Sequence, residues 1–175
     1  MSSSANASSH AYWIKGKFEV WKGHFLLAIT LSFVWMIIAK NHYYYNHNFI
    51  SFIGINLFPL VGWAVGLFIV HRLFIKLGTY FKKINYFANI LLFSIIYWSL
   101  LIAAETIGYH FFNIKNLATA SYPGLPMCDC LHAPVWMKIG YFAMGPIFFF
   151  ICRFMNLGYS ETNSDSIMDI NVQVR

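Results

Sequence analysis

Apolar residues along this chain gather into four long runs that short polar segments separate. Lys22 and Lys40 bracket the first run, the second closes at His71, and the third ends at Glu105. The fourth begins near Ala133, and its short uncharged part leaves a re-entrant segment as an alternative to a full span. Runs such as the first show no strict alternation of apolar and polar positions, which a barrel strand would need. Because backbone polar groups must be paired internally in lipid, such runs predict helices that span a membrane.

We therefore expect an all-α integral membrane protein, a bundle of four transmembrane helices with short loops. The transmembrane domain should cover 23–156, and Pro59, which lies inside the second run, predicts a kink. Mostly polar residues at 1–22 predict a partly disordered cytosolic segment, and 157–175 predict a polar cytosolic tail. The expected spans are about 23–40, 49–71, 86–108 and 134–154.

The composition excludes an ordinary soluble domain. Of the 175 residues, 59% are hydrophobic and only 10% are charged, whereas soluble domains carry about 25% charged residues. A domain of this length has too little interior to bury so much apolar side chain. The abundant Tyr and Trp residues are typical of membrane–water interfaces, and the run at 41–48 predicts an aromatic girdle rather than a copper site.

The distribution of Lys and Arg predicts the orientation. Nine of the 12 precede the first run, separate the second from the third, or follow the fourth. Positive charge stays on the cytosolic side, so we expect a multi-pass protein of the cell membrane with both termini in the cytosol. The net charge of +6 suits anionic lipid headgroups and requires no nucleic acid. The nine are Lys15, Lys17, Lys22, Arg72, Lys76, Lys82, Lys83, Arg153 and Arg175, and the other three are Lys40, Lys115 and Lys138.

The segment between the third and fourth runs carries a cluster of reactive side chains. Cys128, Cys130 and His132 are candidate ligands for zinc or iron, although the spacing is tighter than in most zinc sites. The two thiols could instead pair in a disulfide, since an outward loop is oxidising. A third interpretation is a packed turn with small thiols filling space. The sequence leaves all three open.

Glu105 is the acidic residue that adjoins a predicted span, which makes it a candidate functional group. A carboxyl group in an apolar setting suits a general acid, and Tyr109 lies on the same helix face as a hydrogen-bond partner. His110, Asp129 and His132 complete the candidate catalytic set.

Four histidines lie at the ends of the predicted spans. His24 and His71 belong to the cytosolic side, and His110 and His132 to the outer side. Paired histidines in a four-helix bundle can bind haem as axial ligands, so haem binding is a further, weaker hypothesis. Cys152 lies within the fourth span and is expected to be a packing residue.

One short stretch resembles a known group of proteins. Glu105 and Gly108 lie late in a helix and precede a loop with Tyr122, Gly124 and Pro126, followed by Trp136. This order resembles small membrane proteins of carotenoid metabolism, such as the heterodimeric lycopene cyclases and carotenoid hydratases. The resemblance implies an isoprenoid substrate and gives no role to Cys128, Cys130 or His132.

Function follows less directly than topology. Gly54, Gly62 and Gly66 recur along the second run, and small residues at such spacing favour helix association. The leading hypothesis is an accessory subunit of a membrane complex, in contact with the lipid bilayer and other membrane subunits. The alternatives are a membrane-embedded enzyme acting on a lipid or isoprenoid, and a metal-binding or haem-binding redox protein.

Overall fold

The computed structural model describes residues 3–78 and 85–155, with side chains from residue 21 onward. Four long helices dominate it: α1 (Ser3–Ala39), α2 (Leu57–Gly78), α3 (Tyr86–Thr106) and α4 (Val135–Phe154). The smaller elements are the 3-10 turn η1 (Lys40–His42), the strands β1 (Ser51–Phe52) and β2 (Ile55–Asn56), and the π-helical turn η2 (Ile107–Phe111).

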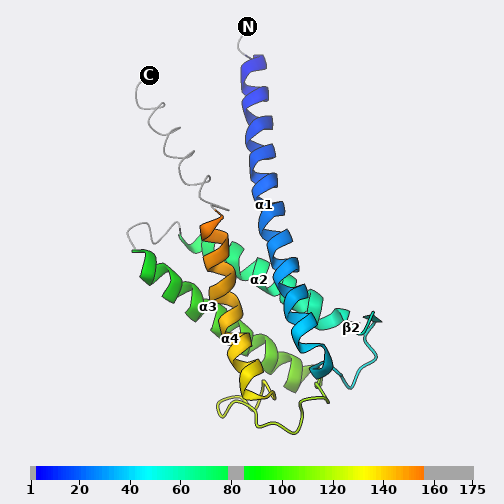
Figure 1. Cartoon of the computed structure of the whole chain (residues 1–175). Coiled ribbons are helices and arrows are strands. Elements are labelled where there is room, and N and C mark those ends of the chain that lie inside the picture. The colour runs from blue at the N-terminus through cyan, green and yellow to red at the C-terminus, as the bar shows by residue number, and fades with distance from the viewer. Residues whose placement is uncertain (1–2, 79–84, 156–175) are drawn as a thin grey trace.

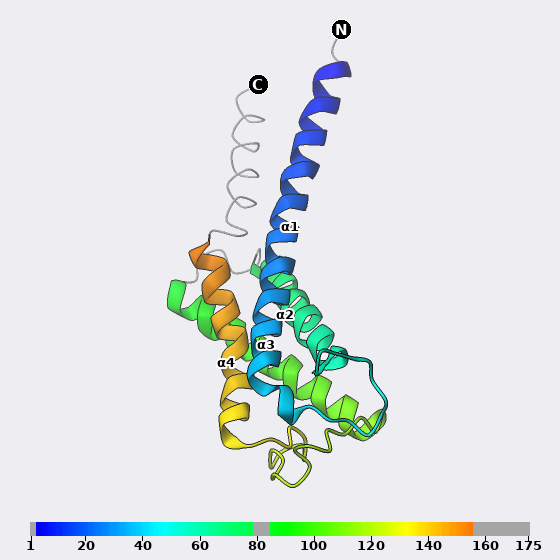
Figure 2. The same cartoon turned by 45° about the vertical axis from the view of Figure 1, so that its right-hand side comes forward.

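Successive helices run in alternating directions, so the chain has two distinct ends (Figures 1 and 2). The end of α2, the start of α3 and the end of α4 lie together at one end, and α1 extends beyond them. The loops before α2 and before α4 lie together at the other, which is called the loop end below. The four segments long and apolar enough to cross a membrane are Trp21–His42, Leu57–Leu77, Tyr86–Phe111 and Val135–Phe154.

The second helix begins later than the sequence predicted. Residues 51–56 form an antiparallel hairpin that pairs Ser51 with Asn56 and Phe52 with Ile55. Positive φ angles at Ile53 and Gly54 turn the chain between the two strands, as two-residue hairpins require. The predicted start at residue 49 was therefore wrong, because the apolar run conceals this turn.

Proline has a different role in α2 and in α4. Asn56 accepts a hydrogen bond from the backbone N–H of Phe58 (3.0 Å) and so caps the start of α2. Pro59 falls in the first turn, where its missing N–H costs nothing, and the kink predicted there was wrong. Pro146 is the internal proline, in α4, and the carbonyl of Phe142 therefore lacks its helical donor. The indole Nε1 of Trp98 donates to that carbonyl instead (2.8 Å).

Two further predictions need correction. The N-terminal segment is helical from Ser3 rather than partly disordered, since Ala, Lys and Glu within it are good helix formers. The loops are not all short, because helical structure ends at Phe111 and resumes only at Val135. The predicted tail at 157–175 lies outside the described residues.

The two loops at the loop end are bonded to each other. Asn46 joins them most extensively: its side chain donates to the carbonyl of Asn113 (2.7 Å), and it accepts from the N–H of Lys115 (2.8 Å). Asn116 accepts from the N–H of Tyr44 (3.1 Å) and donates to the carbonyl of His42 (2.6 Å). This polar network closes the loop end of the bundle and positions the side chains of the candidate site.

Candidate functional site

A cavity of about 450 Å³ lies between α2, α3 and the two bonded loops. Its walls are mainly apolar, with side chains such as Phe58, Leu67, Val70, Leu73 and Leu101. Most of the polar groups lie toward the loop end, and the lining side chains that carry polar atoms are Tyr43, Tyr45, Trp63, Tyr97, Glu105, Tyr109, Asn116, His132 and Tyr141. The volume falls in the range of small-molecule sites, which are also mostly apolar with a few placed polar groups.

Glu105 is the one carboxyl side chain that lines this cavity. It lies in the last turn of α3 and is followed directly by Thr106 and η2, a type of irregular turn that is frequent at functional sites. Among the described residues, none forms a hydrogen bond or an ion pair with Glu105. The expected partner, Tyr109, also lines the cavity, but its ring stacks on His132 with centroids 5.0 Å apart.

Glycines create part of the cavity volume. Gly62, Gly66 and Gly108 line it, and a Cβ added at any of them would meet no atom within 4 Å. The glycines of α2 were expected to support helix association. Within the described part of the chain no atom lies within 4 Å of a Cβ added at Gly62 or Gly66, and association with another helix there stays a prediction.

An aromatic cluster forms the wall of the cavity that lies toward α1. The hydroxyl of Tyr43 accepts hydrogen bonds from the indole nitrogens of Trp35 (2.8 Å) and Trp63 (3.2 Å). Burial raises the pKa of Tyr43 to about 12, against the lowering effect of hydrogen bonds with Tyr141, Trp35 and Trp63, so the phenol stays neutral. Burial likewise raises the pKa of Tyr45.

The aromatic-girdle prediction for 41–48 therefore fails at Tyr43. Its side chain is only 8% exposed, whereas the neighbouring Tyr44 is 68% exposed. The sequence spacing of the tyrosines does not predict this difference in exposure, because it depends on how the chain leaves the turn η1.

The loop before α4 contains the predicted cysteine cluster, and the two cysteines form the disulfide Cys128–Cys130. The backbone N–H of Leu125 donates to the carbonyl of Cys130 (2.7 Å) and closes the turn. Gly124 is required here, since a Cβ would lie 2.9 Å from Asp129 Oδ1 and 3.1 Å from the Cys130 carbonyl oxygen. In this form neither sulfur is a thiolate ligand, so the predicted zinc or iron site needs the reduced loop and stays a prediction.

The two histidines of the predicted catalytic set direct ring nitrogens at backbone carbonyls of this loop, and their catalytic role stays a prediction. His132 Nδ1 lies 2.8 Å from the carbonyl oxygen of Tyr122, and its Nε2 lies 3.1 Å from that of Asp129. A neutral imidazole carries one N–H and can donate to only one of the two, whereas an imidazolium donates to both. His110 Nε2 lies 2.8 Å from the carbonyl oxygen of Cys128. Of the candidate set, only Glu105 and His132 line the cavity.

Of the four histidines of the haem hypothesis, His24 and His71 lie together, but not around space for a porphyrin. The rings of His24 and His71 are in direct contact, with centroids 4.4 Å apart, which leaves no room for a macrocycle between them. His110 and His132 direct ring nitrogens at backbone carbonyls. Sequence reasoning also missed that Cys152, buried as expected, lies beside His24 and His71.

Sequence reasoning found Glu105 and His132 but not the cavity that they share. The glycines of α2 carried a signal, because glycine inside a helix also marks a close approach of a ligand. Comparison with known proteins adds no relative, since no family model, no curated protein and no solved structure matches the chain.

Proposed function

We propose that the protein is a membrane-embedded enzyme that binds an apolar lipid or isoprenoid between α2 and α3 and uses Glu105 as its proton donor. One observation carries this proposal: a mostly apolar cavity of about 450 Å³ whose lining includes a single carboxyl side chain. The four long apolar helices supply a membrane domain from which an apolar molecule can enter.

The shape of the cavity supports an apolar occupant that approaches the backbone closely. At Gly62 and Gly66 the lining is bare helix backbone, and apolar side chains of α2 and α3 cover much of the remainder. Most of the polar groups lie toward the loop end, where they would orient one functional group of the bound molecule.

Glu105 has the surroundings that proton transfer requires. A carboxyl group without an ionic partner can give its proton to a carbon–carbon double bond or an oxygen of the bound molecule. The Glu105 O–H bond breaks and a C–H or O–H bond forms on the substrate. The carboxylate then takes a proton back from the resulting cation, so the step balances without a cofactor.

The distribution of charge supports a placement in the cell membrane. Lys22, Arg72, Lys76 and Arg153 belong to the helix segments away from the loop end, whereas Lys40, Lys115 and Lys138 belong to the loop end. We propose that the first end faces the cytosol, as positive charge favours. Lys82, Lys83 and Arg175 lie outside the described residues.

The accessory-subunit hypothesis stays a prediction. The exposed apolar side chains of all four helices are what contact with lipid alone requires, and no described feature singles out a protein partner. Purification of the protein with a stoichiometric second subunit and an empty cavity would favour that function over an enzyme.

Binding is tested with a matched pair of variants on α3. Both alanines are exposed, but Ala104 lines the cavity and the adjacent Ala103 does not. We expect mass spectrometry of the purified protein to find a bound apolar molecule in wild type and in Ala103→Leu, and little of it in Ala104→Leu. Equal amounts in both variants would contradict the proposed site.

Catalysis is tested by hydrogen exchange into the bound molecule, because a deuterium label can be detected in a substrate of any structure. The protein is purified with its bound molecule from cells grown in H₂O and then incubated in D₂O, and non-exchangeable deuterium in the bound molecule is measured. We expect incorporation with wild type and none above background with Glu105→Gln, which keeps the volume but cannot donate a proton at neutral pH. Equal incorporation would remove Glu105 from the mechanism.

A further inference from the structure

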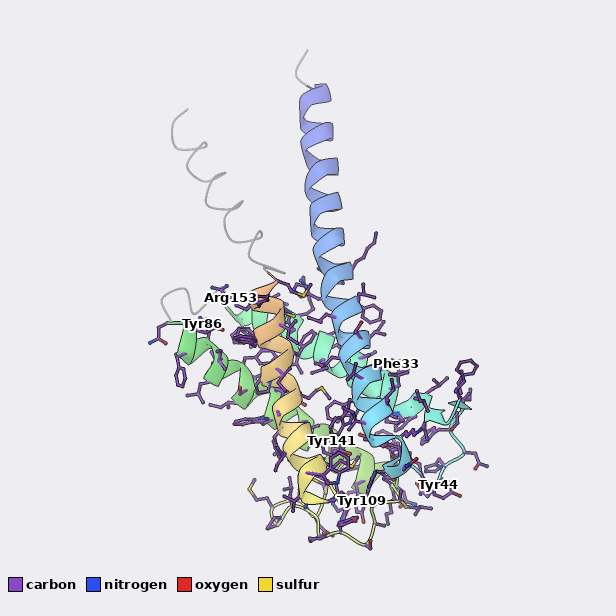
Figure 3. The ribbon with its side chains drawn as sticks, viewed as in Figure 1. Phe33, Tyr44, Tyr86, Tyr109, Tyr141 and Arg153 are labelled. Atoms are coloured by element: carbon purple, nitrogen blue, oxygen red, sulfur yellow. A yellow bond between two sulfur atoms is a disulfide. The ribbon has the colours of Figure 1, made fainter. Side chains whose placement is uncertain are left out.

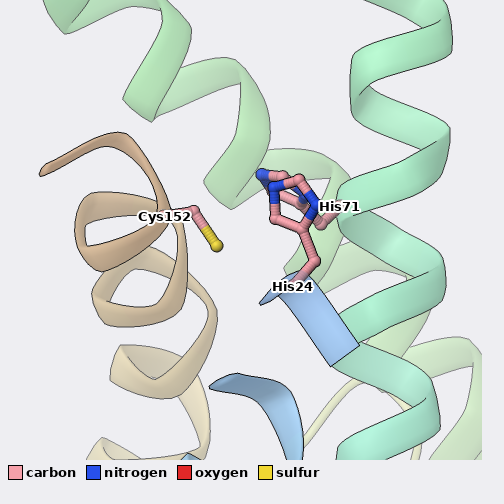
Figure 4. Close-up of side chains that lie close together, drawn as sticks. All are labelled: His24, His71 and Cys152. Carbon is pink, nitrogen blue, oxygen red and sulfur yellow. The ribbon is translucent and has the colours of Figure 1, made fainter. Parts of the chain in front are cut away.

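Three side chains from three different helices meet in the bundle near the end opposite the loops. They are His24 of α1, His71 of α2 and Cys152 of α4, and one ligand atom of each lies within 4.8 Å of the other two. Their side chains are 0%, 4% and 1% exposed. Figure 4 shows the Cys152 sulfur directed toward the two imidazole rings, which lie against each other.

Packing alone does not account for this cluster. The Nδ1 atom of His71 is buried and has no hydrogen-bond partner among the described residues, although buried polar atoms are normally paired. The rings of Phe93, Phe148 and Phe149 surround His71, with centroids 5.5 to 6.2 Å from its own. A buried ring nitrogen surrounded only by aromatic rings costs free energy unless a partner binds it. A metal ion is such a partner, because it accepts the lone pair of the nitrogen.

The spacing of the ligand atoms suits one metal ion. Bonds of about 2.0–2.3 Å place the ligand atoms of a metal roughly 3.3–4 Å from one another. The present separations reach 4.8 Å at most, so rotations of the side chains within the cluster would close the site.

We propose that His24, His71 and Cys152 form a three-coordinate site for Cu(I). Thiolates favour Cu(I), and imidazoles also bind copper well, so this set of ligands suits Cu(I). The charge of Cu(I) cancels that of the thiolate, so the filled site is neutral and suits an apolar interior. Zn²⁺ would leave one net positive charge beside Arg72, and the cluster offers no fourth His, Cys, Asp or Glu among the described residues.

The site is independent of the cavity proposed for the enzyme. His71 contacts Phe93 near the start of α3, and Glu105 lies roughly three turns further along that helix. Copper binding therefore neither uses Glu105 nor requires a bound apolar molecule. Failure of one proposal leaves the other unaffected.

The test is a titration of the full-length protein, purified in detergent, with Cu(I) under anaerobic conditions against a coloured Cu(I) chelator. We expect one tightly bound Cu(I) per chain and a rise in melting temperature on binding. X-ray absorption at the copper edge should show one sulfur and two imidazole nitrogens. Binding of zinc but not Cu(I), or a copper shell without sulfur, would overturn the proposal.

Variants locate the copper. Cys152→Ser changes one atom and should weaken Cu(I) binding by roughly 100-fold or more, and copper should no longer raise its melting temperature. The matched control replaces both Cys128 and Cys130 by serine and should bind copper as wild type does. Retained affinity in Cys152→Ser, or loss of binding in the control, would place the copper elsewhere and refute the site. Should Cys152→Ser fail to fold, His71→Gln provides the same comparison.

Discussion

At the scale of single residues, buried polar atoms are paired across helices by aromatic side chains. The Tyr43 hydroxyl serves two indole N–H groups, and Trp98 donates to the carbonyl that Pro146 deprives of its helical partner. Tyr97 adds a third such bond, from its hydroxyl to the carbonyl of Tyr141 (2.6 Å). These bonds fix side-chain positions that apolar contacts alone would leave less defined.

Replacement of Tyr43 by phenylalanine tests the first of these bonds. The substitution keeps the ring but removes the acceptor of Trp35 and Trp63, and each unpaired buried donor costs about 1–3 kcal/mol. We expect a clear fall in melting temperature in detergent. Tyr44→Phe is the control and should leave stability unchanged, because Tyr44 is exposed. Equal effects would show that the Tyr43 hydroxyl makes no net contribution.

At the scale of elements, the glycines divide into two kinds. A Cβ at Gly140 would lie 2.3 Å from the Trp35 ring, and one at Gly145 would lie 2.4 Å from the Tyr97 ring. These glycines of α4 let aromatic rings pack directly on the helix backbone. Gly62 and Gly66 of α2 have open space in the same position.

This division predicts opposite effects of the same substitution. Gly145→Ala should destabilise the protein by about 1–3 kcal/mol, because the added methyl group overpacks against Tyr97. Gly62→Ala should leave stability unchanged or raise it by about 0.5–1 kcal/mol, since alanine is the better helix former. The melting temperatures of the two variants, measured in the same detergent, test this difference in stability. A larger loss in Gly62→Ala would mean that α2 is more tightly packed at that position than described.

The four helices could be predicted because uncharged runs of this length have few alternatives. The hairpin at 51–56 could not be predicted, since its apolar residues continue the second run and hide the turn at Ile53 and Gly54. Glu105 was identified by its charge, but the cavity depends on how α2 and α3 lie relative to each other. The approach of Cys152 to His24 and His71 depends on the rotation of three helices about their axes, which sequence periodicity does not define.

At the scale of the whole molecule, the bundle has a polarity along its length. Figure 3 shows Tyr86 and Arg153 toward one end and Tyr44 and Tyr109 toward the other. The candidate copper cluster belongs to the first end, and the bonded loops with Glu105 belong to the second. The two proposed sites, which differ in chemistry, thus lie in opposite halves of one small bundle.

The proposed orientation is tested with topology reporters. Fusions after residue 78 and at the C-terminus should report the cytosol, and a fusion near Ser121 should report the outside, because the larger group of Lys and Arg favours the cytosolic side. Measurements need both a cytosolic and an extracytosolic reporter at each position. A C-terminal fusion active on the outside, together with a cytosolic residue 78, would contradict the four-span arrangement.

The bare backbone at Gly62 and Gly66 has a consequence for how the sequence tolerates change. In saturation mutagenesis, most positions lose activity because the protein no longer folds, so abundance and activity fall together. Side chains at these two glycines have room and should leave abundance intact, while they occupy the volume that the proposed substrate would need. At Gly62 and Gly66, substitutions would then lower activity while the protein stays abundant. At Gly140 and Gly145, substitutions would lower both.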